Sequence, residues 1–157
     1  MQGVVIMRGV SGSGKSTWIA GLRLGLGKTY TVTVVSMDHY FMHEGRYVFA
    51  STKLTAASAS CFKAYLLALA DLGPKQIIVV DNTNTTAVEI APYVLAASAF
   101  DMPWCFVELS VPADLERNIH GVPLNTVLSQ AQRLCQSLPP FWLEHDDFRN
   151  FVYCSSV

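Results

Sequence analysis

Hydrophobic positions along the chain fall into two alternating patterns, short apolar runs and longer stretches with helical spacing. The short runs end at glycine or polar clusters, which predicts buried strands at 3–7, 31–35, 77–80 and 104–109. The helical spacing predicts helices over 15–24, 52–72, 87–100 and 124–137, with a further helix beginning in 112–118. The tail, 150–157, predicts a fifth strand, and the polar and aromatic segment 36–47 predicts a loop.

Strands that alternate with helices, and that are apolar on both faces, are typical of a parallel sheet covered by helices on both sides. The sequence contains no internal repeat, low-complexity segment or linker, so its 157 residues predict one domain over 1–157. We therefore expect an α/β fold, a three-layer sandwich with a central parallel sheet of about five strands.

Composition narrows the class of protein. Half of the residues are hydrophobic (51%), which favours a globular chain, yet no apolar run reaches the roughly 18 residues of a membrane span. The first residues lack the basic region of a secretory signal, and we expect a soluble, cytoplasmic protein. The four cysteines form no CxxC motif, and Cys61 and Cys105 lie in apolar segments, where we expect buried thiols.

Charge is unevenly distributed although the formal net charge is only −1. The first 37 residues carry four basic side chains and no acidic one, whereas the chain from residue 81 onward carries nine acidic side chains and three arginines. A cationic N-terminal part suits an anionic ligand, and chance in a short window is the alternative explanation.

The strongest motif follows the first predicted strand. Residues 9–16, Gly-Val-Ser-Gly-Ser-Gly-Lys-Ser, match G-x-x-x-x-G-K-[ST] between an apolar strand and a helix, the setting of a phosphate-binding P-loop. Lys15 is predicted to reach the β- and γ-phosphates of ATP, and the Ser16 hydroxyl to bind Mg²⁺. The residues predicted to hold the nucleotide are Gly9, Ser11, Gly12, Ser13, Gly14, Lys15, Ser16 and Thr17, with Arg133 from a later helix.

A P-loop alone does not separate kinases, ATPases and switch GTPases. The chain has no N-K-x-D segment to read guanine and is shorter than the large motor ATPases, which leaves a phosphoryl-transfer enzyme as the favoured class. The fold expected is thus a P-loop NTPase sandwich that binds ATP and Mg²⁺.

Acidic and amide side chains follow the second and third predicted strands, where ligands collect in open α/β sheets. Asp38 is a candidate base for an attacking hydroxyl, or a turn cap. Asp81 is a candidate for the Mg²⁺ site. Asn82 and Asn84 are candidates to orient the acceptor, or to cap the next helix.

Arg117 lies in the segment "LERNIHGVP" and is predicted to swing over the triphosphate and neutralise charge during transfer. Gly121 and Pro123 would form the hinge of this lid. The alternative is an ordinary helix end with an exposed arginine.

Four motifs in order resemble the P-loop kinases of the polynucleotide 5′-hydroxyl kinase group: "GSGKSTW" at 12–18, "SMDHYF" at 36–41, "VVDNTN" at 79–84 and "RNIHGVP" at 117–123. This group of small AAA-type kinases includes phage polynucleotide kinases and kinase-like modules of larger eukaryotic proteins. The resemblance spans about residues 3–135 and implies a compact α/β kinase with an arginine-bearing lid.

The resemblance assigns Lys15, Asp38 and Arg117 to catalysis, with Asp38 as the base, and Ser16 and Asp81 to Mg²⁺. The candidate residues on the acceptor side are Asp38, Tyr40, Arg46, Asn82 and Asn84. Asn82 falls where several members have an essential aspartate. Some polynucleotide kinases grip the acceptor's phosphate with an arginine three residues after the base. Here that position is Phe41, and Arg46 is the available substitute.

The function expected is an ATP- and Mg²⁺-dependent kinase that transfers the γ-phosphoryl group to a hydroxyl. The favoured acceptor is a 5′-hydroxyl of DNA or RNA. Alternatives are a hydroxymethylpyrimidine in DNA, a nucleoside or another small metabolite, because the chain lacks the basic tract of long nucleic-acid binders. A nucleotide-dependent binding module without an acceptor is the rival from another class.

Overall fold

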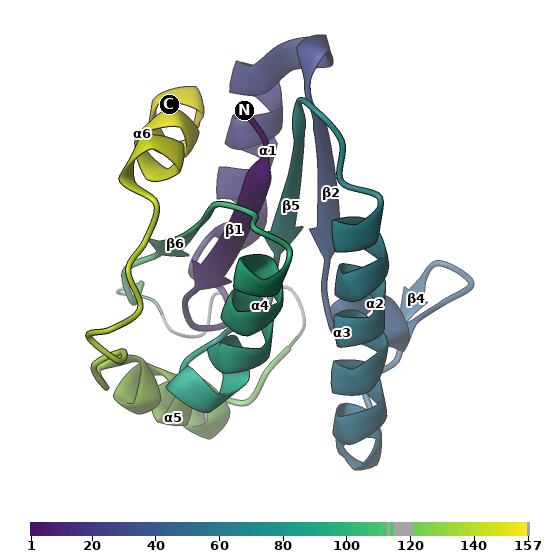
Figure 1. Cartoon of the computed structure of the whole chain (residues 1–157). Helices are drawn as coiled ribbons and strands as arrows, with labels where there is room; N and C mark the ends of the chain where they lie inside the picture. The colour runs from purple at the N-terminus through teal and green to yellow at the C-terminus, as the bar shows by residue number, and fades with distance from the viewer. Residues whose placement is uncertain (113, 115–120, 157) are drawn as a thin grey trace.

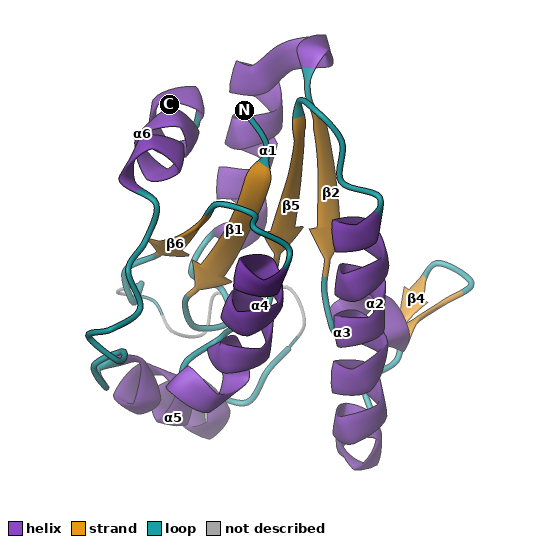
Figure 2. Ribbon diagram, viewed as in Figure 1, coloured by secondary structure: helices purple, strands orange, loops and turns teal. Residues whose placement is uncertain are grey.

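The structure is a computed structural model, and it describes residues 1–112, 114 and 121–156. A parallel sheet with the strand order β2-β5-β1-β6 forms the centre of the described fold (Figures 1 and 2). Its strands are β1 (Gly3–Arg8), β2 (Thr31–Val35), β5 (Gln76–Val80) and β6 (Trp104–Glu108). The three strand pairs are all parallel, which confirms the α/β class and the parallel sheet expected from the sequence.

Helices cover both faces of this sheet, and α5 lies beyond its carboxyl edge (Figure 2). One face carries α1 (Lys15–Leu26) and α6 (Asp146–Ser155), and the other carries α3 (Leu54–Ala70) and α4 (Ala87–Ala99). The remaining helical segments are α2 (Asp38–Phe41), α5 (Leu124–Leu134) and the 3-10 turns Gly27–Thr29 and Ser51–Lys53. The predicted helix beginning in 112–118 falls mainly outside the described residues.

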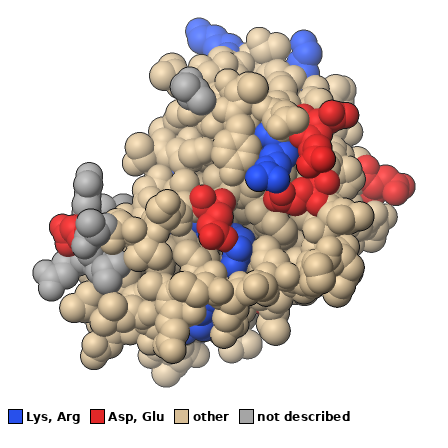
Figure 3. All heavy atoms as spheres, turned by 90° about the vertical axis from the view of Figure 1, so that its left-hand side faces the viewer, with Lys and Arg blue, Asp and Glu red and all other residues tan. Residues whose placement is uncertain are grey.

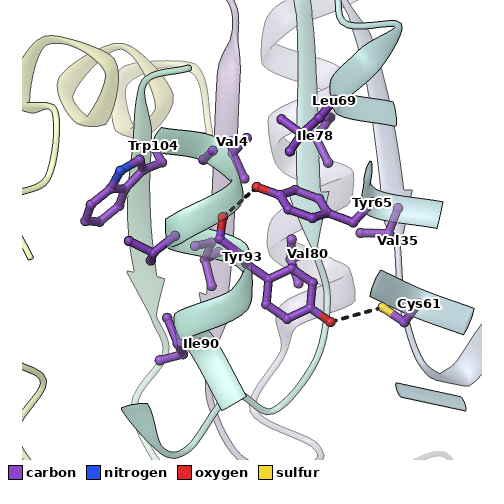
Figure 4. Close-up of a cluster of buried hydrophobic side chains, with 13 residues drawn as sticks. Val4, Val35, Cys61, Tyr65, Leu69, Ile78, Val80, Ile90, Tyr93 and Trp104 are labelled. Atoms are coloured by element: carbon purple, nitrogen blue, oxygen red, sulfur yellow. Dashed lines mark hydrogen bonds between the residues drawn. The ribbon is translucent and has the colours of Figure 1, made fainter. Parts of the chain in front are cut away.

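The buried strand β1 supplies both layers of the core because its side chains alternate between the two faces. Val4 and Ile6 pack with α3 and α4, whereas Val5 and Met7 pack with α1 and α6. In the first of these layers a tyrosine pair joins the helices (Figure 4). The Tyr65 hydroxyl donates to the carbonyl of Tyr93 at 2.8 Å.

Both cysteines expected to be buried are buried. The Tyr93 hydroxyl donates a weak hydrogen bond to the Cys61 sulfur at 3.5 Å (Figure 4). Burial raises the pKa of the Cys105 thiol to about 12, so this thiol stays protonated and behaves as a small apolar side chain.

The C-terminal tail is a helix, so the predicted strand at 150–157 was wrong. Phe148, Phe151 and Val152 follow helical spacing and pack against the α1 face of the sheet. Asp146 and Asp147 stand in the first turn, where negative charge stabilises a helix start. The apolar run in the tail is too short for its pattern alone to separate a strand from a helix. The sheet of the described fold therefore has four strands, with β6 at one edge.

The segment predicted as a loop, 36–47, contains more regular structure than expected. After the single turn of α2, two short antiparallel strands form a hairpin, β3 (Met42–His43) and β4 (Arg46–Tyr47). The two residues between them, Glu44 and Gly45, have φ angles of 48° and 78°, as a tight two-residue hairpin turn requires.

Helix α6 lies against a glycine on α1. A Cβ atom on Gly25 would overlap the backbone carbonyl oxygen of Ser155, so the end of α6 sits directly on the α1 backbone. We expect Gly25→Ala to lower the free energy of unfolding by about 1 kcal/mol or more, because overpacking outweighs alanine's better helix propensity.

Urea denaturation followed by circular dichroism measures this loss. Gly73→Ala is the matched control, since its added Cβ would meet its neighbours at ordinary van der Waals distances of 3.6 Å and more. Equal stability of the two variants would contradict the close contact between α6 and α1.

Candidate active site

The loops that follow β1, β2 and β5 meet at the carboxyl edge of the sheet (Figure 1). They bring Lys15, Asp38 and Asp81 together from three separate parts of the sequence. Both carboxylates lie close enough to act on the Lys15 ammonium, where their negative charge favours its protonated form. The structure thus assembles one cation and two anions that sequence analysis had assigned to a single site.

The glycine-rich loop after β1 leads into a helix whose start is open. Gly12 and Gly14 have φ angles of 82° and 93°, a backbone region that glycine enters without steric cost. Gly14 precedes α1, no side chain caps this helix, and its first turn contains no acid. The amides at the start of α1 and its positive dipole end are therefore available to an anion.

Helix α4 begins at the same edge of the sheet, but its start is capped by side chains, unlike the start of α1. The Thr86 hydroxyl accepts from the Glu89 amide, and the Glu89 carboxylate accepts from the amides of Thr86 and Thr85, in a complete capping box. Its helix start is satisfied by the chain itself. Asn82 and Asn84 were alternative candidates to cap this helix, and the structure assigns the cap to Thr86 instead.

Lys15 lies folded against its own loop. Its ammonium donates to the carbonyl oxygens of Gly9 at 3.0 Å and Val10 at 2.9 Å. An ammonium has three donors, so these two bonds orient the group and leave a third N–H for an anion. Burial lowers the pKa of Lys15 below its ordinary 10.5, and the charges of Asp81 and Asp38 oppose that shift.

Asp38 begins the single turn of α2 directly after β2 and is held at both backbone and carboxylate. Its own amide donates to the Ser36 hydroxyl at 3.2 Å, and the amide of Met37 donates to Oδ1 of Asn82 at 2.9 Å. Its carboxylate Oδ1 accepts from the Tyr47 hydroxyl at 2.9 Å. Tyr47 was not among the predicted site residues, because only the hairpin brings it back onto Asp38.

A hollow of about 200 Å³ opens beside the start of α1. Its lining includes Ser16, Asp81 and His39 together with Ile19, Arg23 and Val34. One hydroxyl and one carboxylate on a shared hollow suit Mg²⁺, which keeps several waters and takes few protein ligands when it binds with phosphates. Groups of three or more His, Cys, Asp or Glu that could hold a metal are absent from the described residues. The donor set therefore fits a phosphate-associated Mg²⁺.

One predicted acceptor residue, Arg46, lies differently from the others. Arg46 pairs with His43 in the hairpin, so alternation directs it to the face opposite Tyr47 and Asp38. The structure does not bring Arg46 to Asp38. Phe41 is buried, at 2% exposure, and presents no polar group to an acceptor. Arg117 lies outside the described residues.

Asn82 and Asn84 both serve the structure through their amides. Oδ1 of Asn82 accepts from the Met37 amide, and its Nδ2 donates to the Tyr93 hydroxyl at 3.3 Å. Asn84 is buried, and its Nδ2 donates to the carbonyl of Met7 at 2.8 Å. The backbone carbonyl of Asn84 accepts from Nε of Arg8. Arg8 also pairs with Glu108 across the β1–β6 ladder. Contacts of Asn82 and Asn84 with an acceptor stay predictions. The same holds for Tyr40, which is half-buried beside Phe41.

Helix α5 supports the P-loop from behind. Val127 and Leu134 pack on Val10, and Oε1 of the buried Gln130 accepts from the Ser11 amide at 2.9 Å. Arg133, predicted to contact the nucleotide, donates from Nε to the Thr85 hydroxyl at 3.1 Å. Sequence analysis did not identify Gln130, although a glutamine between buried positions of an amphipathic helix is a usable signal.

Comparisons with known proteins identify the family and the fold of the chain. A sequence model of the family described as an AAA domain matches residues 4–120. The match covers most of the chain, which belongs to this AAA domain family. Two solved chains are similar in structure, each from a Pnkp1/Rnl/Hen1 complex. The first, from the RNA repair complex, has a TM-score of 0.63 and 15% identity over 85% of this chain and 43% of its own. The second has a TM-score of 0.54 and 16% identity over 92% of this chain and 43% of its own.

A chain of Kti12 from Chaetomium thermophilum, in complex with ADP-AlF3, matches with a TM-score of 0.49 and 20% identity over 96% of this chain and 79% of its own. This chain spans less than half the length of the Pnkp1/Rnl/Hen1 chains it matches, at 43%. The family match and the shared fold confirm the P-loop NTPase fold expected from the sequence. Across the described part of the chain, every helix is too short or too polar to cross a membrane.

Proposed function

We propose that this chain is an ATP- and Mg²⁺-dependent kinase, one domain over residues 1–157, that transfers the γ-phosphoryl group to a hydroxyl. The observation that carries the proposal is the uncapped start of α1 with Lys15 beside it, facing two carboxylates from neighbouring strands. An anion grip next to a paired base and metal ligand is what phosphoryl transfer requires.

Each residue then has one role. The loop amides and Lys15 hold and orient the phosphates, and Asp38 accepts the proton of the attacking hydroxyl. Ser16 and Asp81 would hold Mg²⁺, which neutralises charge on the transferring group when it is bound. Arg117 would add positive charge from the lid.

The acceptor proposed is a 5′-hydroxyl of DNA or RNA, which the four ordered motifs favour. The RNA repair complex that contains a similar chain agrees with a nucleic-acid acceptor. Three observations favour the alternative of a modified base, nucleoside or small metabolite. Phe41 is buried where some polynucleotide kinases carry an arginine, and Arg46 faces away from Asp38. On the face shown in Figure 3, the described acidic and basic side chains lie interspersed, without a continuous basic tract.

We further propose a cytoplasmic location. All four cysteines are free thiols, two buried and two exposed, as is usual in a reducing compartment.

The test is transfer of labelled γ-phosphate from ATP in the presence of Mg²⁺. The acceptor panel contains 5′-hydroxyl oligonucleotides, hydroxymethylpyrimidine DNA, nucleosides and water alone. We expect label on an oligonucleotide end. Label only on modified DNA or a nucleoside would retain the kinase and change its acceptor. Nucleotide binding without label on any acceptor would contradict the kinase and favour the binding module.

A further inference from the structure

The hairpin after α2 returns a tyrosine to the proposed base. Strands β3 and β4 fold 42–47 back on themselves, and the Tyr47 hydroxyl donates to Oδ1 of Asp38 at 2.9 Å. The two residues are nine positions apart, so the bond depends on the hairpin and not on helical spacing. The hairpin thereby contacts the carboxylate that is proposed to act as the base.

Aromatic residues pack around Phe41 and hold the Tyr47 ring in place. Its centroid lies 6.1 Å from that of buried Phe41 at an interplanar angle of 69°, an edge-to-face contact. Phe49 packs on the same Phe41 at 5.1 Å, and the amide of Val48 donates to the Phe41 carbonyl at 2.8 Å. Phe41 therefore connects the end of α2 to the hairpin and limits the positions that the Tyr47 hydroxyl can reach.

The phenol also remains a donor throughout the working pH range. Burial raises the pKa of Tyr47 above its ordinary 10.0, and its hydrogen bond to Asp38 and the charge of that carboxylate raise it further. The Tyr47 proton is therefore not lost where a kinase would act.

We propose that Tyr47 is a positioning residue, which fixes the Asp38 carboxylate in the orientation that accepts the proton of the attacking hydroxyl. This proposal rests on the proposed kinase function. An aspartate side chain has two rotatable bonds, and its backbone is already held through Met37 and Ser36. The Tyr47 hydrogen bond adds a contact at the carboxylate itself, on Oδ1. A misplacement of about 1 Å at a reacting group costs about a hundredfold in rate.

The test is Tyr47→Phe, which removes the hydroxyl and keeps the ring on Phe41. We expect kcat for phosphoryl transfer to fall about ten- to a hundredfold, with the dissociation constant for ATP and the melting temperature unchanged. Tyr153→Phe is the matched control. Its hydroxyl makes no hydrogen bond to the described residues, and its ring lies on α6, so transfer should be unchanged.

A double-mutant cycle separates positioning from a structural role. In the Asp38→Asn background, Tyr47→Phe should lower the residual transfer no further, because the carboxylate through which it acts is already lost. An equal loss in both backgrounds, or no loss in the wild-type background, would overturn the proposal.

Carbon-13 NMR of the Asp38 carboxyl group provides a readout without activity. The resonance is assigned from its absence in Asp38→Asn, and it should move in Tyr47→Phe and stay in place in Tyr153→Phe. A resonance unmoved by Tyr47→Phe would exclude the contact and the proposal with it. Absence of transfer in the wild-type protein with every acceptor would instead overturn the kinase function and, with it, this role of Tyr47.

Discussion

Replacing Asp38 with asparagine should lower the rate of phosphoryl transfer by about 10² to 10⁴-fold while the protein continues to bind ATP. Asparagine keeps the size of the side chain and can still accept from Tyr47, but it cannot take up a proton from the acceptor. The loss therefore reports general-base chemistry. Single-turnover transfer of labelled phosphate gives the rate, and calorimetry with a non-hydrolysable ATP analogue gives the affinity.

The control for this change is Asp71→Asn, which removes the same charge from an exposed carboxylate at the end of α3. Its transfer rate should equal that of the wild-type protein. If Asp38→Asn transferred phosphate at the wild-type rate, Asp38 would not be the base and the acceptor site would lie elsewhere. If it lost ATP binding as well, the carboxylate would serve the nucleotide and not the acceptor.

Lys15→Met should weaken ATP binding and slow phosphoryl transfer. A charge-assisted hydrogen bond to phosphate contributes about 1.5–3 kcal/mol, so the dissociation constant for ATP should rise about ten- to a hundredfold. Transfer should fall by about 10³-fold beyond that, because the same ammonium stabilises charge that develops on the transferring group. Methionine preserves the length and apolar stem of lysine without its donors.

The pH dependence of ATP affinity tests the same residue. Burial lowers the pKa of Lys15, and the protonated form binds phosphate, so wild-type affinity should decline as the pH rises toward the ordinary lysine value of 10.5. The Lys15→Met protein should lack this decline. Lys28→Met, at an exposed lysine after α1, serves as the control and should bind like the wild-type protein. Unchanged affinity in Lys15→Met would contradict the phosphate-loop assignment.

Sequence patterns predicted most of the fold because its central strands, β1 and β5, are buried on both sides. Apolar runs such as 77–80 have no surface position to obscure them, and the glycine loop and capping residues mark the helix starts. The tail was misread because "FVYC" is equally apolar as strand or helix, and only tertiary contact with α1 selects the helix. The two-residue strands of the hairpin are too short for any periodicity.

Within the site, the residues at strand ends were predictable and their supports were not. Lys15, Asp38 and Asp81 each follow a recognisable strand, and the topology of a parallel sheet places such positions at one edge. The contact of Tyr47 with Asp38 depends on how the hairpin folds back, which local spacing does not encode. For Gln130 the spacing on α5 signals a buried polar side chain, but it does not identify Ser11 as the partner.

The contact between Gln130 and the P-loop has a consequence for synthesis of the protein. Ser11 and Gln130 are 119 positions apart, so the ribosome releases the phosphate loop long before the helix that supports it. Strand β1 likewise obtains its neighbours β5 and β6 only from later segments. The first motif to be translated is thus among the last to acquire its native surroundings, and we expect the nascent chain to gain affinity for nucleotide only after α5 has left the exit tunnel.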